Sequence, residues 1–434
     1  MNKKVLSAHQ KLFTTLTWII RLLCGAVFIY SGFVKAIDPW GTLYKLYDYF
    51  ATWHVEPISS LLLVGVFALC VYEFLIGIFL WTGCFRRSTP IFGLLFMCVM
   101  LPLTFWIALF NPVADCGCFG DALILTNWQT FWKNIVITGM LIWLIKFNSI
   151  CRCLIRPSLQ WGALLVSIAY IVVIGFAGYY YQPLLDFRPF PKGKSLVPVS
   201  MTSDTDTAEF IFVYAKDGIQ HTFTIDDQLP DEEDGWTFIE RKELNPRPVK
   251  VIDKDLDTSF RIWSEDGEED VTEDVIHDNG NTLLLLMPDL DNVSISTTWK
   301  INSLYKWAEQ HNVDMMAVVA STPQGIERWY DLALPEYPIY TAEDTLIKML
   351  ARGNPAVVYL HDGVIQWKST LRALPNSDFA DDNVDFNPEI MDRDTTRALL
   401  NITFIYIAII IVIGCLSFLP SISVLFRSNI GKSR

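Results

Sequence analysis

The architecture of this chain is organised around the segment Asp115-Cys116-Gly117-Cys118-Phe119-Gly120, a short polar loop with long apolar runs on both sides. Two cysteines separated by one residue form a dithiol that can close on itself, pass its oxidation to another protein, or hold a metal. Glycine between them permits the bent backbone that so small a ring requires. A disulfide here would be strained, and strained, exposed disulfides are the exchangeable kind. A static clip or two free thiols is the alternative interpretation.

The surroundings of the cysteine pair bear on its reactivity. Asp115 and Asp121 flank it, and their charges would raise the thiol pKa values unless a cation offsets them. Lys35 is the nearest candidate cation. Asp38 and the proline after it form a turn signal that ends the first helix. The aromatic residues at 44–53 then predict an amphipathic segment that lies beside the loop and covers it.

Composition predicts a membrane protein with one large soluble insert. The chain has 434 residues, is 52% hydrophobic and contains 15 tryptophans, and its apolar residues are concentrated at the two ends. The net charge of −13 comes mostly from the insert and argues against nucleic-acid binding. The six histidines form no visible ligand set with the cysteines, so no metal site is predicted. Four of the nine cysteines, Cys24, Cys70, Cys98 and Cys415, lie in apolar segments, where they are expected to act as packing residues.

Six apolar segments reach the length of about 20 residues that a helix needs to span a bilayer. They are Leu12–Phe33, Ile58–Trp81, Pro90–Phe110, Trp128–Phe147, Gln160–Tyr180 and Leu399–Phe426. Basic residues without acidic neighbours occupy the N-tail, the second-to-third and fourth-to-fifth connections, and the C-tail. By the positive-inside rule these segments are cytoplasmic. The expected location is therefore a bacterial inner membrane, with both termini cytoplasmic and residues 181–398 periplasmic. This topology places Cys116 and Cys118 in an oxidising compartment.

Two of the charged residues inside predicted membrane helices have opposite signs and lie in adjacent helices. Arg21 is in the first helix and Glu73 in the second, and both are a few turns from the cytoplasmic end. Intramembrane charges usually pair or line a polar site. We therefore expect Arg21 and Glu73 to approach each other, and the alternative is that Arg21 extends to the headgroups alone.

The first 150 residues resemble the DoxX/MauE group of small membrane proteins. The resemblance rests on the run from Gly25 through Ser31-Gly32-Phe33-Val34-Lys35 to Asp38-Pro39 and Gly41, and on Cys116-Gly117-Cys118-Phe119-Gly120. It implies a four-helix membrane bundle associated with thiol–disulfide redox. MauE is linked to maturation of a disulfide-rich methylamine dehydrogenase, and DoxX to quinone-coupled sulfur oxidation. No sequence feature marks a quinone site in this chain, and a methylamine role is not carried over.

The soluble insert contains two differently patterned parts. Residues 209–225 predict a β-hairpin with an Asp-Gly turn at 217–218. From residue 282 to 368, strand and helix patterns alternate and end in a hairpin led by Pro355. This order resembles the thioredoxin fold, and the resemblance implies a cis peptide bond at Pro355. Where a thioredoxin would show Cys-x-x-Cys, this chain has Pro288–Ser294 without cysteine. The domain is therefore not expected to exchange disulfides itself.

The sequence thus predicts an α-helical membrane protein, a four-helix DoxX/MauE-like bundle plus two further transmembrane helices, with an α/β thioredoxin-like extracytoplasmic domain. The predicted parts are the bundle at 1–150, a fifth transmembrane helix at 151–182, a β-rich part at 183–270, a degenerate thioredoxin-like domain at 271–380, an acidic linker at 381–398, a sixth transmembrane helix at 399–427 and a basic tail at 428–434.

Two functional hypotheses follow. In the first, Cys116 and Cys118 exchange with extracytoplasmic protein thiols or disulfides, and the thioredoxin-like domain docks the partner, with Lys35, Asp38, Arg21, Glu73 and Pro355 in supporting places. In the second, the protein is a non-enzymatic, membrane-anchored binding or assembly factor, and the cysteine pair is a structural clip. A transporter has little support, because internal repeats and broken helices are not evident.

Overall fold

The computed structural model describes residues 3–55, 57–113, 115–197, 210–216, 219–224, 236–243, 260–375, 379 and 394–418. The chain divides into two compact units, one of Met1–Ser195 with Arg261–Arg434 and the other of Leu196–Phe260. The first unit carries the cysteine loop.

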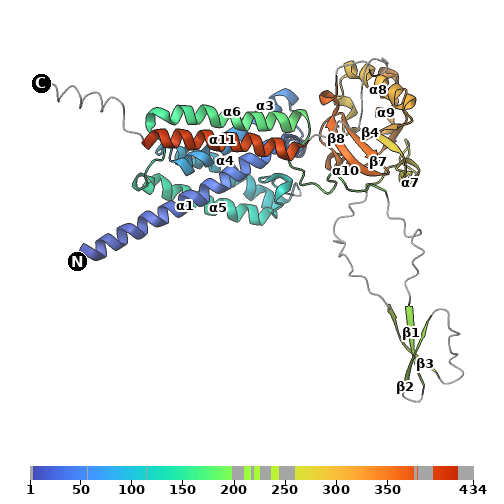
Figure 1. The fold of residues 1–434 in the computed structure, drawn as a ribbon, viewed down its shortest axis with the longest axis horizontal. Coiled ribbons are helices and arrows are strands. Elements are labelled where there is room, and N and C mark those ends of the chain that lie inside the picture. Colours follow the sequence, from blue (N-terminus) through green and yellow to red (C-terminus); the bar gives the residue numbers. More distant parts are fainter. Residues whose placement is uncertain are drawn as a thin grey trace. The chain divides into compact units, whose positions relative to one another are not determined.

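Six helices in the described part of the chain are long and apolar enough to cross a membrane. They are α1 (Lys3–Ile37), α3 (Ser59–Thr82), α4 (Ser88–Phe110), α5 (Asn127–Phe147), α6 (Gln160–Tyr180) and α11 (Thr395–Phe418). These helices run side by side (Figure 1), with α1 packed on α3, α5 and α6, α4 on α5, and α11 on α6. The six predicted spans are confirmed.

Glycines set the close packing of α1 against α3. A Cβ atom added at Gly32 would lie 2.5 Å from Phe74 N, and Gly25 similarly faces Trp81 and the backbone of Gly77. Small residues allow helix backbones to approach closely in a membrane, where van der Waals packing rather than the hydrophobic effect holds helices together. The contacts also fix an antiparallel register in which Gly25 lies level with Gly77.

A short amphipathic helix, α2 (Pro39–Thr52), follows α1. Asp38 caps its N-terminus by accepting a hydrogen bond from Gly41 N at 2.9 Å, and Pro39 occupies the first helical position, where its missing N–H costs nothing. The predicted turn at Asp38 and the predicted aromatic segment are confirmed. Since Tyr49 of this helix reaches Cys116, α2 lies beside the cysteine loop as expected.

The C-terminal part of the first unit is a mixed five-stranded sheet with helices. Its strands are β4 (Asn281–Met287), β5 (Asp314–Val319), β6 (Ile339–Thr341), β7 (Ala356–His361) and β8 (Val364–Thr370), in the order β6-β5-β4-β7-β8. The strands β4, β5 and β6 are parallel, and β7 is antiparallel to both of its neighbours. The helices are α7 (Thr272–Val275), α8 (Thr298–Gln310), α9 (Pro323–Ala333) and α10 (Asp344–Leu350).

The predicted alternation of strands and helices between 282 and 368 is confirmed element by element. Near-continuous apolar strands such as β4, whose six residues from Thr282 to Met287 are all buried, are expected at the centre of a sheet covered on both faces. The Asn354–Pro355 peptide bond is cis, the geometry that the resemblance implied.

The segment predicted as a β-rich part at 183–270 divides in the structure. Its two ends join the five-stranded sheet, because Ser195 bridges to Val364 of β8 and Trp263 bridges to Thr341 of β6. The middle forms the second unit, a separate antiparallel sheet of β1 (Phe210–Lys216), β2 (Ile219–Thr224) and β3 (Thr237–Glu243) in the order β2-β1-β3. The strands of the predicted hairpin are confirmed.

Several predicted features lie outside the described residues. They are the turn at 217–218, most of the acidic linker at 381–398, the last residues of the sixth span, and the basic tail at 428–434.

Candidate functional site

Cys116 and Cys118 lie in the connection between α4 and α5, which polar contacts close at its base. Asn111, with a left-handed φ of 45°, ends α4, and a capping box at Thr126 begins α5. Asn127 Nδ2 donates to Asn111 Oδ1 over 3.1 Å and so joins the two ends of the connection. The loop is therefore closed at its base by side chains of the two helices that it connects.

The two thiols face each other across the Gly117 turn. Their Sγ atoms are 3.1 Å apart, and both cysteines are free. Gly117 has a φ of 67°, and a Cβ atom there would lie 3.2 Å from Lys45 Cγ, so glycine suits both the turn and the space. Cys116 is only 8% exposed, whereas Cys118 is half-buried. Cys118 is thus the more exposed residue of the pair.

Side chains from two helices hold the backbone of the pair. Tyr49 of α2 donates its hydroxyl to Cys116 O over 3.0 Å. From α1, Ser31 Oγ donates to Cys118 O over 2.7 Å, and Lys35 Nζ donates to the same carbonyl over 2.6 Å. Ser31 and Lys35 are one helical turn apart and so share a face of α1.

Both acidic neighbours of the pair are neutralised by cations. Lys45 Nζ lies 2.7 Å from Asp115 Oδ2, and Arg352 forms an ion pair with Asp121. Cations therefore offset the negative charges of both carboxylates, which would otherwise raise the pKa values of the two thiols.

The pKa values of the two thiols are shifted in opposite directions. The hydrogen bond from the Cys116 thiol, together with the charges of Lys133 and Lys35, lowers the pKa of the Cys118 thiol to about 6 against the effect of burial. The same hydrogen bond and burial raise the pKa of the Cys116 thiol well above its usual value. Lys133 Nζ lies 4.2 Å from the centroid of the Phe119 ring. This arrangement favours a Cys118 thiolate beside a Cys116 thiol.

A buried ion pair lies directly behind the loop. Lys35 Nζ is 2.9 Å from Glu73 Oε2, and the two residues are 5% and 3% exposed. Lys35 also donates to Ser31 Oγ over 2.7 Å, which with Cys118 O gives the ammonium three acceptors. Glu73, Ser31 and Cys118 also line one small cavity together with Lys133.

The prediction that Arg21 pairs with Glu73 is wrong. Arg21 instead donates to the carbonyls of Leu80, Trp81 and Arg152. In the register of α1 against α3, Arg21 lies level with Trp81, and Glu73 is about 12 Å further along α3. Arg21 thus binds the free carbonyls at the C-terminal end of α3, where a cation is favoured.

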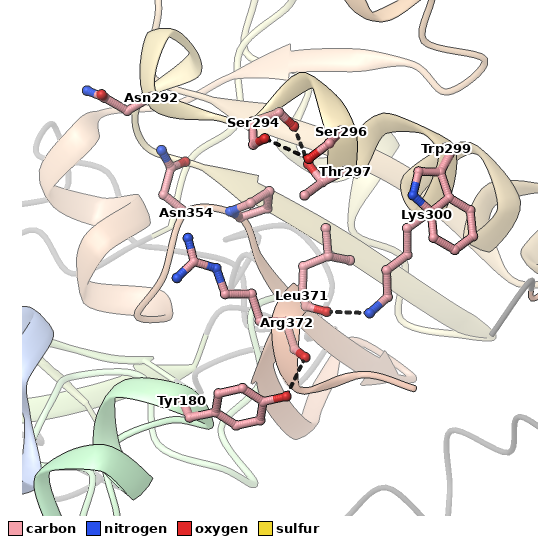
Figure 2. Close-up of a pocket in the computed structure, with 11 residues that line it drawn as sticks. Tyr180, Asn292, Ser294, Ser296, Thr297, Trp299, Lys300, Asn354, Leu371 and Arg372 are labelled. Atoms are coloured by element: carbon pink, nitrogen blue, oxygen red, sulfur yellow. Dashed lines mark hydrogen bonds between the residues drawn. The ribbon is translucent and has the colours of Figure 1, made fainter. Parts of the chain in front are cut away.

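A groove crosses the face of the five-stranded domain near Pro355. The groove has a volume of about 360 Å³, and Figure 2 shows the polar and apolar side chains that line it. Ser294 and Ser296 hydrogen-bond to each other over 2.8 Å, and Lys300 donates to Leu371 O over 3.0 Å, so these groups have structural partners. Asn354 lines this groove and a second hollow floored by aromatic residues of α2. The domain therefore presents its groove next to the helix that supports the dithiol loop.

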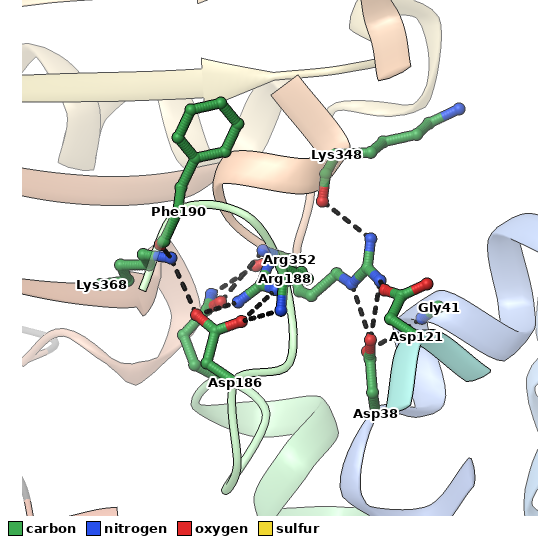
Figure 3. Close-up of polar contacts among 10 residues, drawn as sticks. Asp38, Gly41, Asp121, Asp186, Arg188, Phe190, Lys348, Arg352 and Lys368 are labelled. Atoms are coloured by element: carbon green, nitrogen blue, oxygen red, sulfur yellow. Dashed lines mark hydrogen bonds and ion pairs between the residues drawn. The ribbon is translucent and has the colours of Figure 1, made fainter. Parts of the chain in front are cut away.

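The five-stranded domain contacts the bundle through Arg352. Its guanidinium binds Asp38 at 2.7 Å and also binds Asp121 (Figure 3). Asp38, which was expected near the dithiol, is therefore connected to it indirectly through Arg352. Pro355 follows Arg352 by three residues and lines the groove.

The structure thus assembles some predicted residues and separates others. Cys116, Cys118, Lys35 and Glu73 meet in one place, whereas Arg21 lies at the other end of α3. Among the described residues, no group of three or more His, Cys, Asp or Glu side chains is placed to hold a metal ion.

Sequence reasoning gave no role in the site to Ser31, Lys133 and Arg352, whereas Tyr49 lies in the aromatic segment that was expected beside the loop. Ser31 could have been found from its one-turn spacing to Lys35, and Lys133 from its position as a charge inside an apolar segment. Arg352 gave no local signal, because its two partners are 314 and 231 residues away in the chain.

Comparison with known proteins agrees with the membrane part of this description. Residues 14–147 match the family Methylamine utilisation protein MauE, and residues 208–244 match a domain of unknown function (DUF8463). No curated protein matches the chain significantly. No solved structure does so either. The match and the six apolar helices together support a multi-pass membrane protein whose residues 14–147 are similar to MauE.

Proposed function

We propose that this MauE-type membrane protein carries out thiol–disulfide exchange with extracytoplasmic proteins through Cys116 and Cys118. The observation that carries the proposal is the pair itself, two free thiols 3.1 Å apart, of which Cys118, the more exposed residue, has its pKa lowered to about 6. The thiolate is the attacking species in exchange, so the lowered pKa of the Cys118 thiol favours reaction at this cysteine.

The pair is proposed to face the periplasm from a bacterial inner membrane. The distribution of basic residues supports cytoplasmic termini and a periplasmic segment at 181–398. The ion pair between Arg352 and Asp121 is consistent with this topology, since it requires the dithiol loop and the five-stranded domain to lie on one side.

The exchange is proposed to run in two steps with a protein disulfide as the oxidant. The Cys118 thiolate attacks one sulfur of the partner's disulfide, forming a mixed disulfide and releasing a partner thiolate. Cys116 then loses its proton and attacks Cys118 Sγ, which closes the Cys116–Cys118 disulfide and releases the second partner thiolate. The pair is oxidised by two electrons and the partner's disulfide is reduced to two thiols. The reverse sequence oxidises a partner dithiol.

The five-stranded domain is proposed to be thioredoxin-like and to dock the partner without reacting. Its strand order and the groove beside Asn354 support this role. The sequence contains no cysteine between Cys153 and Cys415, so the domain has no thiol that could take part in disulfide exchange.

The competing function is a binding or assembly factor in which the cysteine pair is static. The hydrogen bonds that hold the carbonyls of Cys116 and Cys118 favour it, because a clip needs a rigid loop.

Mixed-disulfide capture distinguishes the two functions. Cells making the full chain with Cys116→Ser, which lacks the resolving thiol, should accumulate a protein partner on Cys118, visible after acid quenching and non-reducing electrophoresis. The matched Cys118→Ser variant should capture little, because its remaining thiol is buried. If neither variant captures a protein, the exchange function is wrong and the clip remains. Equal capture by both would contradict the assignment of Cys118 as the attacking sulfur.

A further inference from the structure

Arg352 ties three parts of the first unit together. Its Nε atom donates to Asp38 Oδ2 over 2.9 Å, and its Nη2 atom contacts both Asp38 and Asp121 (Figure 3). Asp38 is the N-cap of α2, and Asp121 follows Cys118 by three residues. One guanidinium from the five-stranded domain thus holds two carboxylates of the membrane domain.

This site is closely built around the arginine. Arg352 is 5% exposed, and Gln182 binds its backbone, accepting from Arg352 N at 3.0 Å and donating to Arg352 O at 2.5 Å. A Cβ atom added at Gly41 would lie 2.9 Å from Arg352 Nη2 and 2.6 Å from Asp38 Oδ2. A planar guanidinium suits two carboxylates better than an ammonium, since its donors form a fixed fork.

The two carboxylates are the anchors of the dithiol loop. Asp38 begins the helix that carries Lys45 and Tyr49, and these side chains hold Asp115 and the Cys116 carbonyl from one side. Asp121 lies on the other side of the pair. Arg352 therefore fixes both supports of the loop at once, although it touches neither sulfur.

We propose that Arg352 is a positioning residue of the dithiol site, which keeps Cys116 aligned with Cys118 by clamping Asp38 and Asp121. The inference rests on the proposed function in that it concerns the reactivity of the same thiols. Proximity sets the rate of an intramolecular attack, so a loosened loop slows the attack of Cys116 on a mixed disulfide at Cys118.

Oxidised glutathione tests the clamp without a protein partner. The Cys118 thiolate attacks it, giving a Cys118–glutathione mixed disulfide and one glutathione thiolate. Cys116 then attacks Cys118 Sγ, forming the Cys116–Cys118 disulfide and releasing the second glutathione. The lifetime of the mixed disulfide, followed by mass spectrometry on the full chain in detergent, measures the second step alone.

We expect Arg352→Gln to lengthen that lifetime roughly tenfold, a change that corresponds to losing one charge-assisted contact. Asp121→Asn should lengthen it similarly, and this second variant keeps the Arg352–Asp38 contact and hence the docked domain. Arg352→Lys should give an intermediate lifetime, because an ammonium lacks the fork.

Arg188→Gln is the matched control. Arg188 is also 5% exposed and bound to a carboxylate, Asp186 at 2.7 Å, which Lys368 also binds (Figure 3). This cluster contains no residue of the dithiol loop, so its loss should destabilise the domain while leaving the lifetime unchanged. The clamp is refuted if Arg352→Gln and Asp121→Asn both behave like the wild type, or if Arg188→Gln lengthens the lifetime as much as they do. Since only glutathione is used, this result is independent of whether cells yield a captured protein.

Discussion

The buried pair of Lys35 and Glu73 yields a quantitative prediction. Replacing Glu73 by Gln removes the carboxylate that lies 2.9 Å from Lys35 Nζ and leaves a buried ammonium without a counter-charge. Breaking one half of a buried ion pair costs about 3–5 kcal/mol. At roughly 2–4 °C per kcal/mol, the unfolding temperature should fall by at least about 6 °C. Thermal unfolding of the purified protein in detergent, followed by tryptophan fluorescence, measures this change.

A double-mutant cycle identifies the partner of the carboxylate. Lys35→Met should lower the unfolding temperature on its own, and combining it with Glu73→Gln should cost clearly less than the two single losses added together, because no unpaired charge then remains. In the matched cycle with Arg21→Gln, the losses should add, since about 12 Å of helix separates the two charges. Additive losses for Lys35 with Glu73, or coupling between Arg21 and Glu73, would refute the arrangement described here.

Three further predictions concern the loop and the opposite end of the bundle. The rate at which Cys118 reacts with iodoacetamide should rise with pH about a midpoint near 6, because only the thiolate reacts, and Cys116→Ala should move that midpoint upward by removing the hydrogen bond that stabilises the thiolate. Gly117→Ala should destabilise the protein by about 1–2 kcal/mol, because the φ of Gly117 is 67°. Gly139→Ala is the control and should not destabilise the protein, because its added Cβ atom meets nothing within 4 Å. The unfolding temperatures of the two variants measure the difference. Arg21→Gln should lower the unfolding temperature yet leave the pH midpoint of Cys118 unchanged, and a shifted midpoint would show that the two ends of the bundle are coupled.

Much of the fold follows from local pattern. The apolar runs identify all six membrane helices, and the buried strand at Thr282–Met287 and the hairpin from Ala356 are visible in the alternation of apolar residues and turn signals. These features depend on neighbours in the chain, so a sequence displays them directly. The cysteine pair and Lys35 were identified for the same reason, because their spacing and charge are local properties.

What the sequence did not show are the relations between distant segments. Pairing of Glu73 with Lys35 rather than Arg21 depends on the register of α1 against α3, which is set by glycine contacts such as Gly32 against Phe74. The contact of Arg352 with Asp38 and Asp121 arises only when the five-stranded domain docks on the bundle. Such contacts have no periodicity or spacing from which they could be derived.

Labelling Cys118 from outside intact cells tests the central proposal most directly, since an exchangeable dithiol must be both accessible and able to change its redox state. A membrane-impermeant maleimide should label the full chain at this cysteine, and the labelled fraction should rise after brief treatment with a mild, impermeant reductant. The Cys118→Ser variant gives the background from the other thiols. Labelling that appears only after the membrane is permeabilised, or that does not respond to reductant at all, would contradict an exchangeable pair on the outer face.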